Sequence, residues 1–209
     1  GGKAANPVKI RCYLPPEKWG QTMVQLNGRE AHHLTHVLRV SPGVEVTCFD
    51  GQGTQAQAKV QSVSRKGVSL EMGQQQSVPT PPWGISLAVA IPKHGKLDQI
   101  VDQATQLGVH RLIPLLTARG VVRVSAQEWL KKEPRFKQIA IEAGKQAGVD
   151  RLAILDPVTP WNRFLRLTQG YDRILMGTVE GPHEDLSVLL SEPGVKKVLL
   201  LIGPEGDWT

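Results

Sequence analysis

The chain has 209 residues, which is enough for one large domain or two smaller ones. Its 25 lysines and arginines outnumber its 19 acidic residues, and the resulting net charge of +6 favours an anionic partner. The two cysteines, Cys12 and Cys48, match no metal spacing and no disulfide framework, which favours a reducing compartment. No apolar run approaches the roughly 20 residues that cross a bilayer, and no secretory signal opens the chain, so a cytoplasmic location is expected.

The first part of the chain, residues 1–76, has a mostly β pattern and is the more basic part. Turn signals such as Asn27-Gly28 and Asp50-Gly51 separate short apolar segments that predict strands. These segments are 8–14, 22–26, 44–49, 55–63 and 67–72. Glu30–Val40 predicts one helix, with Ala31, Leu34, Val37 and Leu38 on one side. Five strands and one helix predict a small β-barrel domain.

Residues 77–82 predict a linker, because the proline-rich stretch around them favours an extended spacer. From residue 83 to residue 209, strand patterns alternate with helical ones. The predicted strands are 85–91, 111–116, 152–155, 173–176 and 197–202. Two predicted helices are marked by apolar stripes, one from Leu97 to Leu107 and one from Phe136 to Ala147. Two more helices are predicted at 161–167 and 183–190. This alternation predicts a parallel sheet with helices on both faces.

Two motifs are read as ordinary structure. Gly51-Gln52-Gly53-Thr54-Gln55-Ala56 fits a dinucleotide-binding pattern but lies between two β segments, so a hairpin turn is favoured. His32, His33 and His36 resemble a metal cluster, but no Asp, Glu or Cys nearby supplies a third ligand, and no metal site is predicted. The sequence also contains no Walker loop and no Gly-x-Ser-x-Gly.

The remaining candidates follow predicted strands. Pro92–Lys96 sets Lys93 and Lys96 beside a helix N-terminus, which suits a phosphate, although a solvated loop is the alternative. Arg119 and Arg123 follow another strand. Gly203-Pro204-Glu205-Gly206 ends the most apolar strand and presents backbone groups with little side-chain bulk to a flat ligand. Ligands of parallel sheets bind at these carboxyl ends.

Several blocks in this order resemble the 16S ribosomal RNA uridine-N3 methyltransferase family (the RsmE type) of the SPOUT superfamily. The blocks are RCYLP (11–15), HHLTHVLRV (32–40), FDGQG (49–53), IPKHGKLDQIVDQATQLGVHRLIPL (91–115), RFKQIAIEAGKQ (135–146) and LIGPEGDW (201–208). The resemblance implies a PUA-like β-barrel for RNA, an α/β SPOUT methyltransferase domain of the trefoil-knot type, S-adenosylmethionine as cofactor, and a homodimer without a metal. Its RNA partner would be 16S rRNA or the small ribosomal subunit.

The resemblance also implies roles for individual residues. The implied methyl-donor site comprises Thr178, Glu180, Leu201, Ile202, Gly203, Pro204 and Gly206. Arg11, Arg39, Lys93 and Lys96 are the predicted RNA contacts, because the part before the linker has a basic excess and these residues lie at loops, although a solvated arginine is an equal alternative for Arg39. Two departures from the family pattern stand out. Asp207 replaces the usual second glycine, and the family continues beyond the position of Thr209, so an incomplete knot and weak donor binding are expected here.

The implied reaction requires a weakly acidic imide nitrogen to lose its proton and attack a sulfonium methyl group. A base or a cation near the uracil oxygens could favour the anion, which makes Glu205, Arg119 and Arg123 the candidate catalytic residues. Glu205 could instead cap the following turn. A non-catalytic RNA-binding module remains the main alternative, and a nucleotide-dependent oxidoreductase is a weaker one because no glycine fingerprint opens the helix after residue 91.

Overall fold

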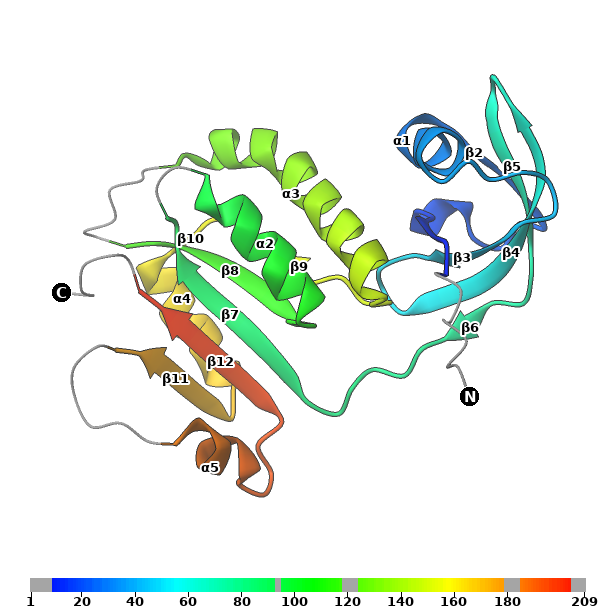
Figure 1. The fold of residues 1–209 in the computed structure, drawn as a ribbon. Coiled ribbons are helices and arrows are strands. Elements are labelled where there is room, and N and C mark those ends of the chain that lie inside the picture. The colour runs from blue at the N-terminus through cyan, green and yellow to red at the C-terminus, as the bar shows by residue number, and fades with distance from the viewer. Residues whose placement is uncertain (1–8, 93–94, 118–123, 179–184, 204–209) are drawn as a thin grey trace, which may run out of the picture. The chain divides into compact units, whose positions relative to one another are not determined.

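The computed structural model describes residues 9–92, 95–117, 124–178 and 185–203 (Figure 1). The chain forms two compact units, residues 1–80 and 81–209, and the division falls within the predicted 77–82 segment. Within the described residues, no helix combines the length and the apolar character needed to cross a membrane.

Unit 1 is built on a curled six-stranded sheet in which β1, β3, β4, β5 and β2 follow one another and β6 pairs with β4. β1 runs parallel to β3, whereas the other pairs are antiparallel. Its elements are β1 (Arg11–Tyr13), η1 (Pro16–Lys18), β2 (Met23–Leu26), α1 (Gly28–His32), η2 (His33–Val37), β3 (Glu45–Phe49), β4 (Thr54–Ser64), β5 (Gly67–Met72) and β6 (Gln76–Ser77). All five predicted strands are therefore present, and β6 is an additional one at the boundary between the predicted β domain and the predicted linker at 77–82.

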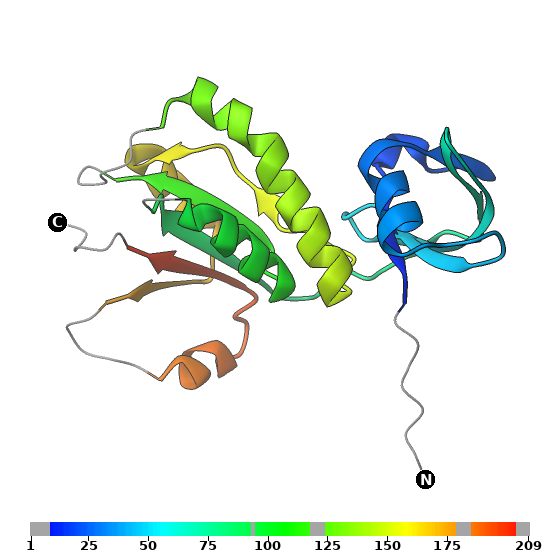
Figure 2. The same cartoon turned by 45° about the horizontal axis from the view of Figure 1, so that its top comes forward.

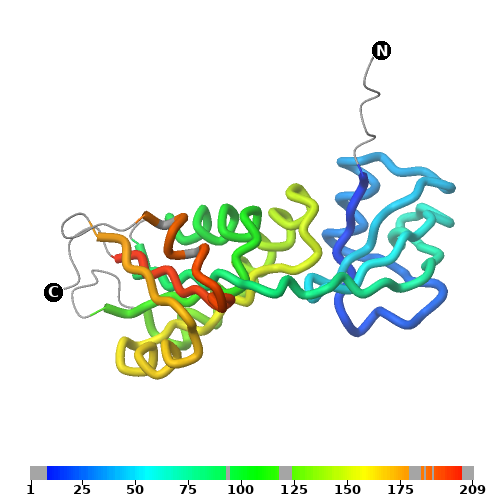
Figure 3. The backbone as a smooth tube through the Cα atoms, turned by 90° about the horizontal axis from the view of Figure 1, so that it is seen from below, coloured from blue at the N-terminus to red at the C-terminus, as the bar shows by residue number. Residues whose placement is uncertain are grey.

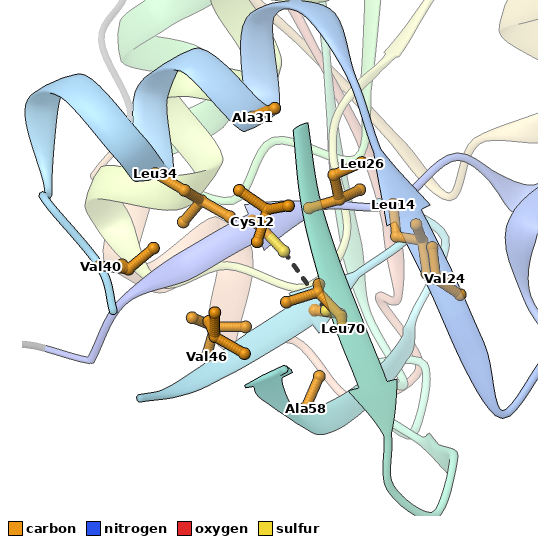
Figure 4. Packing of buried hydrophobic residues seen from close by; sticks show 13 residues of the cluster. Cys12, Leu14, Val24, Leu26, Ala31, Leu34, Val40, Val46, Ala58 and Leu70 are labelled. Atoms are coloured by element: carbon orange, nitrogen blue, oxygen red, sulfur yellow. Dashed lines mark hydrogen bonds between the residues drawn. The ribbon is translucent and has the colours of Figure 1, made fainter. Parts of the chain in front are cut away.

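The core of unit 1 lies against one face of this sheet. In β4, Ala56, Ala58 and Val60 are buried, while Gln57 and Lys59 between them are exposed, as expected for a strand with one solvated face. Cys12 and Cys48 are register partners in β1 and β3, and their sulfur atoms lie 3.3 Å apart in this core (Figure 4). Both residues therefore have a packing role.

The predicted helix at Glu30–Val40 is partly wrong. One short α-helix, α1, passes into a π-helical turn, η2, in which the amide nitrogen of Leu38 donates to the carbonyl oxygen of His33. Ala31 and Leu34 are buried as predicted, but Val37 and Leu38 are 60% and 38% exposed. The wider π turn shifts the helix phase after Leu34, so the 3.6-residue pattern no longer places these two side chains in the core.

The glycine-rich stretch 51–53 is the turn between β3 and β4, as predicted. The carboxylate of buried Asp50 accepts hydrogen bonds from the amide nitrogens of Gln52 and Thr54 at 2.7 and 2.9 Å. Asp50 thus satisfies the backbone of this turn, and the stretch opens no helix.

Unit 2 has a second six-stranded sheet in which β10, β8, β7, β12 and β11 follow one another and β9 pairs with β8. Every pairing in this sheet is parallel. Its elements are β7 (Gly84–Ala90), α2 (Lys96–Gln106), β8 (Arg111–Leu116), α3 (Ala126–Ala147), β9 (Ile154–Leu155), β10 (Thr159–Pro160), α4 (Trp161–Leu167), η3 (Thr168–Gly170), β11 (Arg173–Gly177), α5 (Leu186–Ser191) and β12 (Lys197–Ile202). Figure 3 shows β12, in red, between β7 and β11.

Helices cover both faces of this sheet (Figure 2). α2 and α3 pack on one face, where Val101 and Phe136 meet Val89 and Leu112. α4 packs on the other face, where Phe164 lies with Ile113 and Leu199. Because both faces are covered, β8 and β12 are nearly continuous apolar runs, and their bounds agree with the predicted 111–116 and 197–202.

The two predicted stripes lie in α2 and α3, and the structure adds detail at the ends of these helices. α3 begins at Ala126, ten residues before the first residue of the predicted stripe, because Ser125 and Glu128 form a capping box. Pro134 lies inside α3. Leu107, counted in the buried stripe of α2, follows the helix and is 83% exposed.

Candidate functional site

The carboxyl ends of four parallel strands lie at one edge of the unit 2 sheet. The pairing register sets Gly177 of β11 beside Ile202 of β12, and Ile202 beside Val89 of β7. The next strand, β8, pairs with β7 up to Leu115 and Ala90. The residues that follow these strands, Thr178, Gly203, Ile91 and Thr117, therefore belong to the same edge.

The strand order reverses between β7 and β12. From β7 the chain proceeds outward to β8 and β10, whereas β11 and β12 come later and lie on the opposite side of β7. In open α/β sheets, ligands bind outside the carboxyl ends of the strands at such a switch point. The candidate site therefore lies where β7 and β12 end.

Burial changes abruptly at the end of β12. Leu199 and Leu201 are fully buried, but Ile202 is 45% exposed and Gly203 follows without a side chain. An exposed apolar side chain beside a glycine gives a flat ligand both an apolar surface and close access to the backbone. Thr178, after β11, is exposed at the same edge and adds a hydroxyl group.

Thr117 was not among the predicted site residues. Its hydroxyl oxygen is buried and has no hydrogen-bond partner within the described part of the chain. Such a group has hydrogen-bonding capacity that a ligand could satisfy. The available signal was its position, a hydroxyl residue directly after the apolar strand RLIPLL.

The N-terminus of α2 also lies after β7, at this edge. Gly95 precedes the helix with a φ of +72°, and Lys96 is the first helical residue and is exposed. Asp98 in the first turn forms an ion pair with Arg135 of α3, which fixes the start of α2 against its neighbour. The amino-terminal end of a helix and a lysine both favour negative charge.

Several predicted site residues lie outside the described residues. They are Lys93, Arg119, Arg123, Glu180, Pro204, Glu205 and Gly206. Of the predicted donor-site residues, the sheet edge brings together Thr178, Ile202 and Gly203, with Leu201 buried beneath them. Their roles stay predictions.

The two predicted RNA contacts in unit 1 differ in their surroundings. Arg11 is partly buried, and its guanidinium carbon lies 4.6 Å from the centre of the Phe49 ring, which indicates a packing role. Arg39 is exposed and has a φ of +51°. Among the described residues, no other non-glycine residue has a positive φ.

The three histidines do not form a metal centre within the described residues, where no group of three or more potential metal ligands gathers. The rings of His32 and His36 instead stack, with centroids 4.3 Å apart and planes inclined by 12°. Parallel stacked rings point their nitrogen lone pairs alongside one another, so they do not converge on one ion in this arrangement.

Comparisons with known proteins agree with this architecture. A family model described as an RNA methyltransferase domain matches residues 79–209, and one described as an RNA methyltransferase PUA domain matches residues 26–72. "Ribosomal RNA small subunit methyltransferase E" of Bacillus subtilis is 29% identical over 88% of this chain and 74% of its own length. The protein of the same name in Synechocystis is 26% identical over 95% of this chain and 65% of its own length.

Solved structures show the same fold. A Legionella pneumophila protein described as a methyltransferase, solved with the cofactor SAM bound, has a TM-score of 0.83 at 26% identity. The match covers 96% of this chain and 82% of that protein. A Neisseria gonorrhoeae protein named ribosomal RNA small subunit methyltransferase E matches over the same shares, with a TM-score of 0.80 at 24% identity. The expected fold class, a SPOUT-type α/β domain preceded by a PUA-like β domain, is confirmed. The model of the RNA methyltransferase domain matches well over half of this chain, and the chain therefore belongs to the RNA methyltransferase family.

Proposed function

We propose that this protein transfers the methyl group of S-adenosylmethionine to N3 of a uridine in small-subunit (16S) ribosomal RNA. The switch point between β7 and β12 carries this proposal, because it sets an exposed apolar residue and a glycine at the end of a buried strand within a matched RNA methyltransferase domain. The names of the relatives and the SAM-bound Legionella structure support the choice of substrate and cofactor.

The described residues at this edge fit an adenosine-containing ligand. Ile202 would pack against the flat base, Gly203 would let the ligand approach the backbone, and the hydroxyls of Thr117 and Thr178 would hydrogen-bond polar groups. S-adenosylmethionine would supply a methyl group on a sulfonium, whose departure as a neutral thioether needs no Lewis acid.

The chain must prepare the uracil for attack. N3 carries a proton at neutral pH and lies on the Watson–Crick edge, so the base must be unpaired and its anion favoured. We assign Glu205 as the candidate proton acceptor, and Arg119 and Arg123 as candidate cations that stabilise charge on the uracil oxygens. Lys96 at the start of α2 would hold a phosphate of the RNA.

The test is methyl transfer from tritiated S-adenosylmethionine to 16S rRNA and to small ribosomal subunits that lack this modification. A methyl group on N3 blocks base pairing, so reverse transcription of the product should stop at one uridine. Transfer with such a stop supports the proposal. RNA binding without transfer would favour a non-catalytic RNA-binding module.

Variants separate the roles of the candidate catalytic residues. Loss of a general base should lower kcat by about 10² to 10⁴, and Glu205→Gln should also remove the acid limb of the pH–rate profile. Loss of a charge-stabilising donor should lower kcat by about 10² to 10³, and Arg119→Lys should then recover more activity than Arg119→Ala. A wild-type kcat for the Glu205→Gln variant would contradict a catalytic role. It would favour the alternative in which Glu205 caps the following turn.

A homodimer is also part of the proposal, because the family resemblance implies one. Sedimentation at micromolar protein concentration tests it directly. A monomer under those conditions would contradict this part without affecting the proposed reaction.

A further inference from the structure

The outward side of residues 28–39 is a cationic surface in unit 1. Arg29, His32, His36 and Arg39 are all exposed. Residues 29, 32 and 36 are spaced by three and four positions, which sets them along one side of the helical segment. Neither Arg29 nor Arg39 forms an ion pair among the described residues, and the one carboxylate in this segment, Glu30, accepts a hydrogen bond from the amide nitrogen of Tyr13 in β1 at 3.0 Å.

The histidine pair on this surface is held in place. The hydroxyl oxygen of Thr35 lies 2.9 Å from the carbonyl oxygen of Ala31 and 2.7 Å from Nδ1 of His36. The contact with Nδ1 of His36 is a hydrogen bond in which either atom can be the donor, depending on the tautomer of the ring. His36 is thereby oriented, and its ring stacks on that of His32 with centroids 4.3 Å apart. Val37, which follows His36 in the sequence, is 60% exposed and adds apolar surface to this segment.

Arg39 has a backbone conformation that glycine adopts at a lower cost in free energy. It follows the π turn with a φ of +51°, a left-handed conformation that usually selects glycine at a helix end. An exposed arginine there costs folding free energy without any described contact that offsets the cost. Its charge is therefore the property to explain.

We propose that the outward side of residues 28–39 binds a single-stranded stretch of RNA, with an unpaired base on the His32–His36 pair and phosphates on Arg29 and Arg39. Histidine rings stack with unpaired bases, and arginines bind phosphate oxygens. The segment lies inside the match to the PUA domain of RNA methyltransferases. This inference rests on the proposed function and names the surface of unit 1 that receives the substrate.

The experiment measures the binding of a labelled single-stranded 16S rRNA fragment, and of the same fragment annealed to its complement, at two salt concentrations. His32→Ala/His36→Ala should lower the affinity for the single strand roughly tenfold, because a base loses its stacking surface. His32→Phe/His36→Phe keeps flat rings and should stay within about threefold of wild type.

Arg39→Gly is the sharper variant, because it removes the charge and relieves the backbone at once. It should lower RNA affinity about fivefold and reduce the salt slope by about one, while the melting temperature stays the same or rises. Arg65→Gly is the matched control. Arg65 is an exposed arginine in the turn between β4 and β5, so this variant loses the same charge elsewhere in the unit.

Each outcome decides the matter. Equal RNA affinity of the Arg39→Gly and Arg65→Gly variants, or wild-type affinity of the double alanine variant, overturns the inference. Equal losses for single strand and duplex overturn the stacking role. If the wild-type protein methylates rRNA while these variants bind RNA normally, the proposed function stands and the docking surface does not. A wild-type chain that neither binds nor methylates RNA refutes both.

Discussion

The two sheets differ in which of their parts a ligand can reach. The sheet of unit 1 buries a single face, so β4 alternates buried and exposed residues, and the helical segment 28–39 has a free outer side. The sheet of unit 2 is covered on both faces by helices with separate cores. Its strand ends are what remain for ligands. One unit thus offers a face and the other an edge, which suits a long RNA and a compact cofactor respectively.

The largest expected effect tests the packing of α4 on one face of the unit 2 sheet. Leu199→Ala, at a residue that is 0% exposed in β12, should lower the free energy of unfolding by about 3 kcal/mol through lost burial and a cavity. Ile174 is its register partner in β11 and is 46% exposed. Ile174→Ala should cost less than about 1 kcal/mol. Chemical denaturation measures both, and equal losses would mean that the α4 face is not packed as described.

A comparable test in unit 1 concerns two glycines with a positive φ. A Cβ at Gly67 would lie 2.0 Å from the carbonyl oxygen of Leu26, so Gly67→Ala must push β5 away from β2. We expect a loss of about 2 to 3 kcal/mol in folding free energy. Gly43 has a φ of +92° but open space around its Cβ position, so Gly43→Ala should cost only about 1 kcal/mol. A smaller loss at Gly67 than at Gly43 would contradict the pairing of β2 with β5.

A pH-dependent effect tests the amino-terminal edge of the unit 2 sheet. The carboxylate of Asp172 accepts hydrogen bonds from the amide nitrogens of Lys197 and Lys196 at 2.8 and 3.0 Å, and these bonds lower its pKa below the ordinary 3.8. Because the folded-state pKa is the lower one, this stabilisation is present above pH 3.8 and is lost as the pH falls through the folded pKa. Asp172→Asn should reduce the melting temperature near neutral pH, and the difference from wild type should shrink in acid. A difference that does not change with pH would contradict this role.

The smallest expected effect concerns Trp129 in the α2–α3 core. Its indole nitrogen is buried without a hydrogen-bond partner in the described ranges, so the indole contributes only its apolar ring there. Trp129→Phe removes the unsatisfied N–H and should change the folding free energy by less than about 1 kcal/mol. The smaller ring alone accounts for about 1 kcal/mol, so a loss of about 3 kcal/mol or more would contradict the absence of a partner for this N–H.

The sequence predicted the elements whose pattern depends on burial alone. The alternation in β4 and the continuous apolar run of β12 directly reflect one covered face and two covered faces. The predictions were wrong where local hydrogen bonds, and not the pattern of apolar residues, determine the course of a helix. The π turn at His33–Val37 moves Val37 out of the core, and the capping box at Ser125 starts α3 within a polar stretch that has no stripe.

The candidate site was predictable in position but not in composition. Residues Ile202 and Gly203 follow from the end of an apolar strand, and the parallel sheet brings them to one edge with Thr178. The position of Thr117 after an apolar strand is visible in the sequence, but the burial of its hydroxyl without a partner depends on the surrounding packing. The packing of Arg11 on Phe49 could not be predicted, since a basic residue near a strand end suggests an exposed contact.

The cysteine pair at the centre of unit 1 has a practical consequence. The chain has two thiols, Cys12 and Cys48, and both are 0% exposed in the same core (Figure 4). An alkylating reagent reaches a thiolate only when that core opens. The rate of iodoacetamide labelling, followed by intact mass, therefore measures the opening of unit 1 alone, while unit 2 contributes no signal. The labelling rate of the two cysteines thus reports how often the β domain opens. RNA that binds this domain should lower that rate.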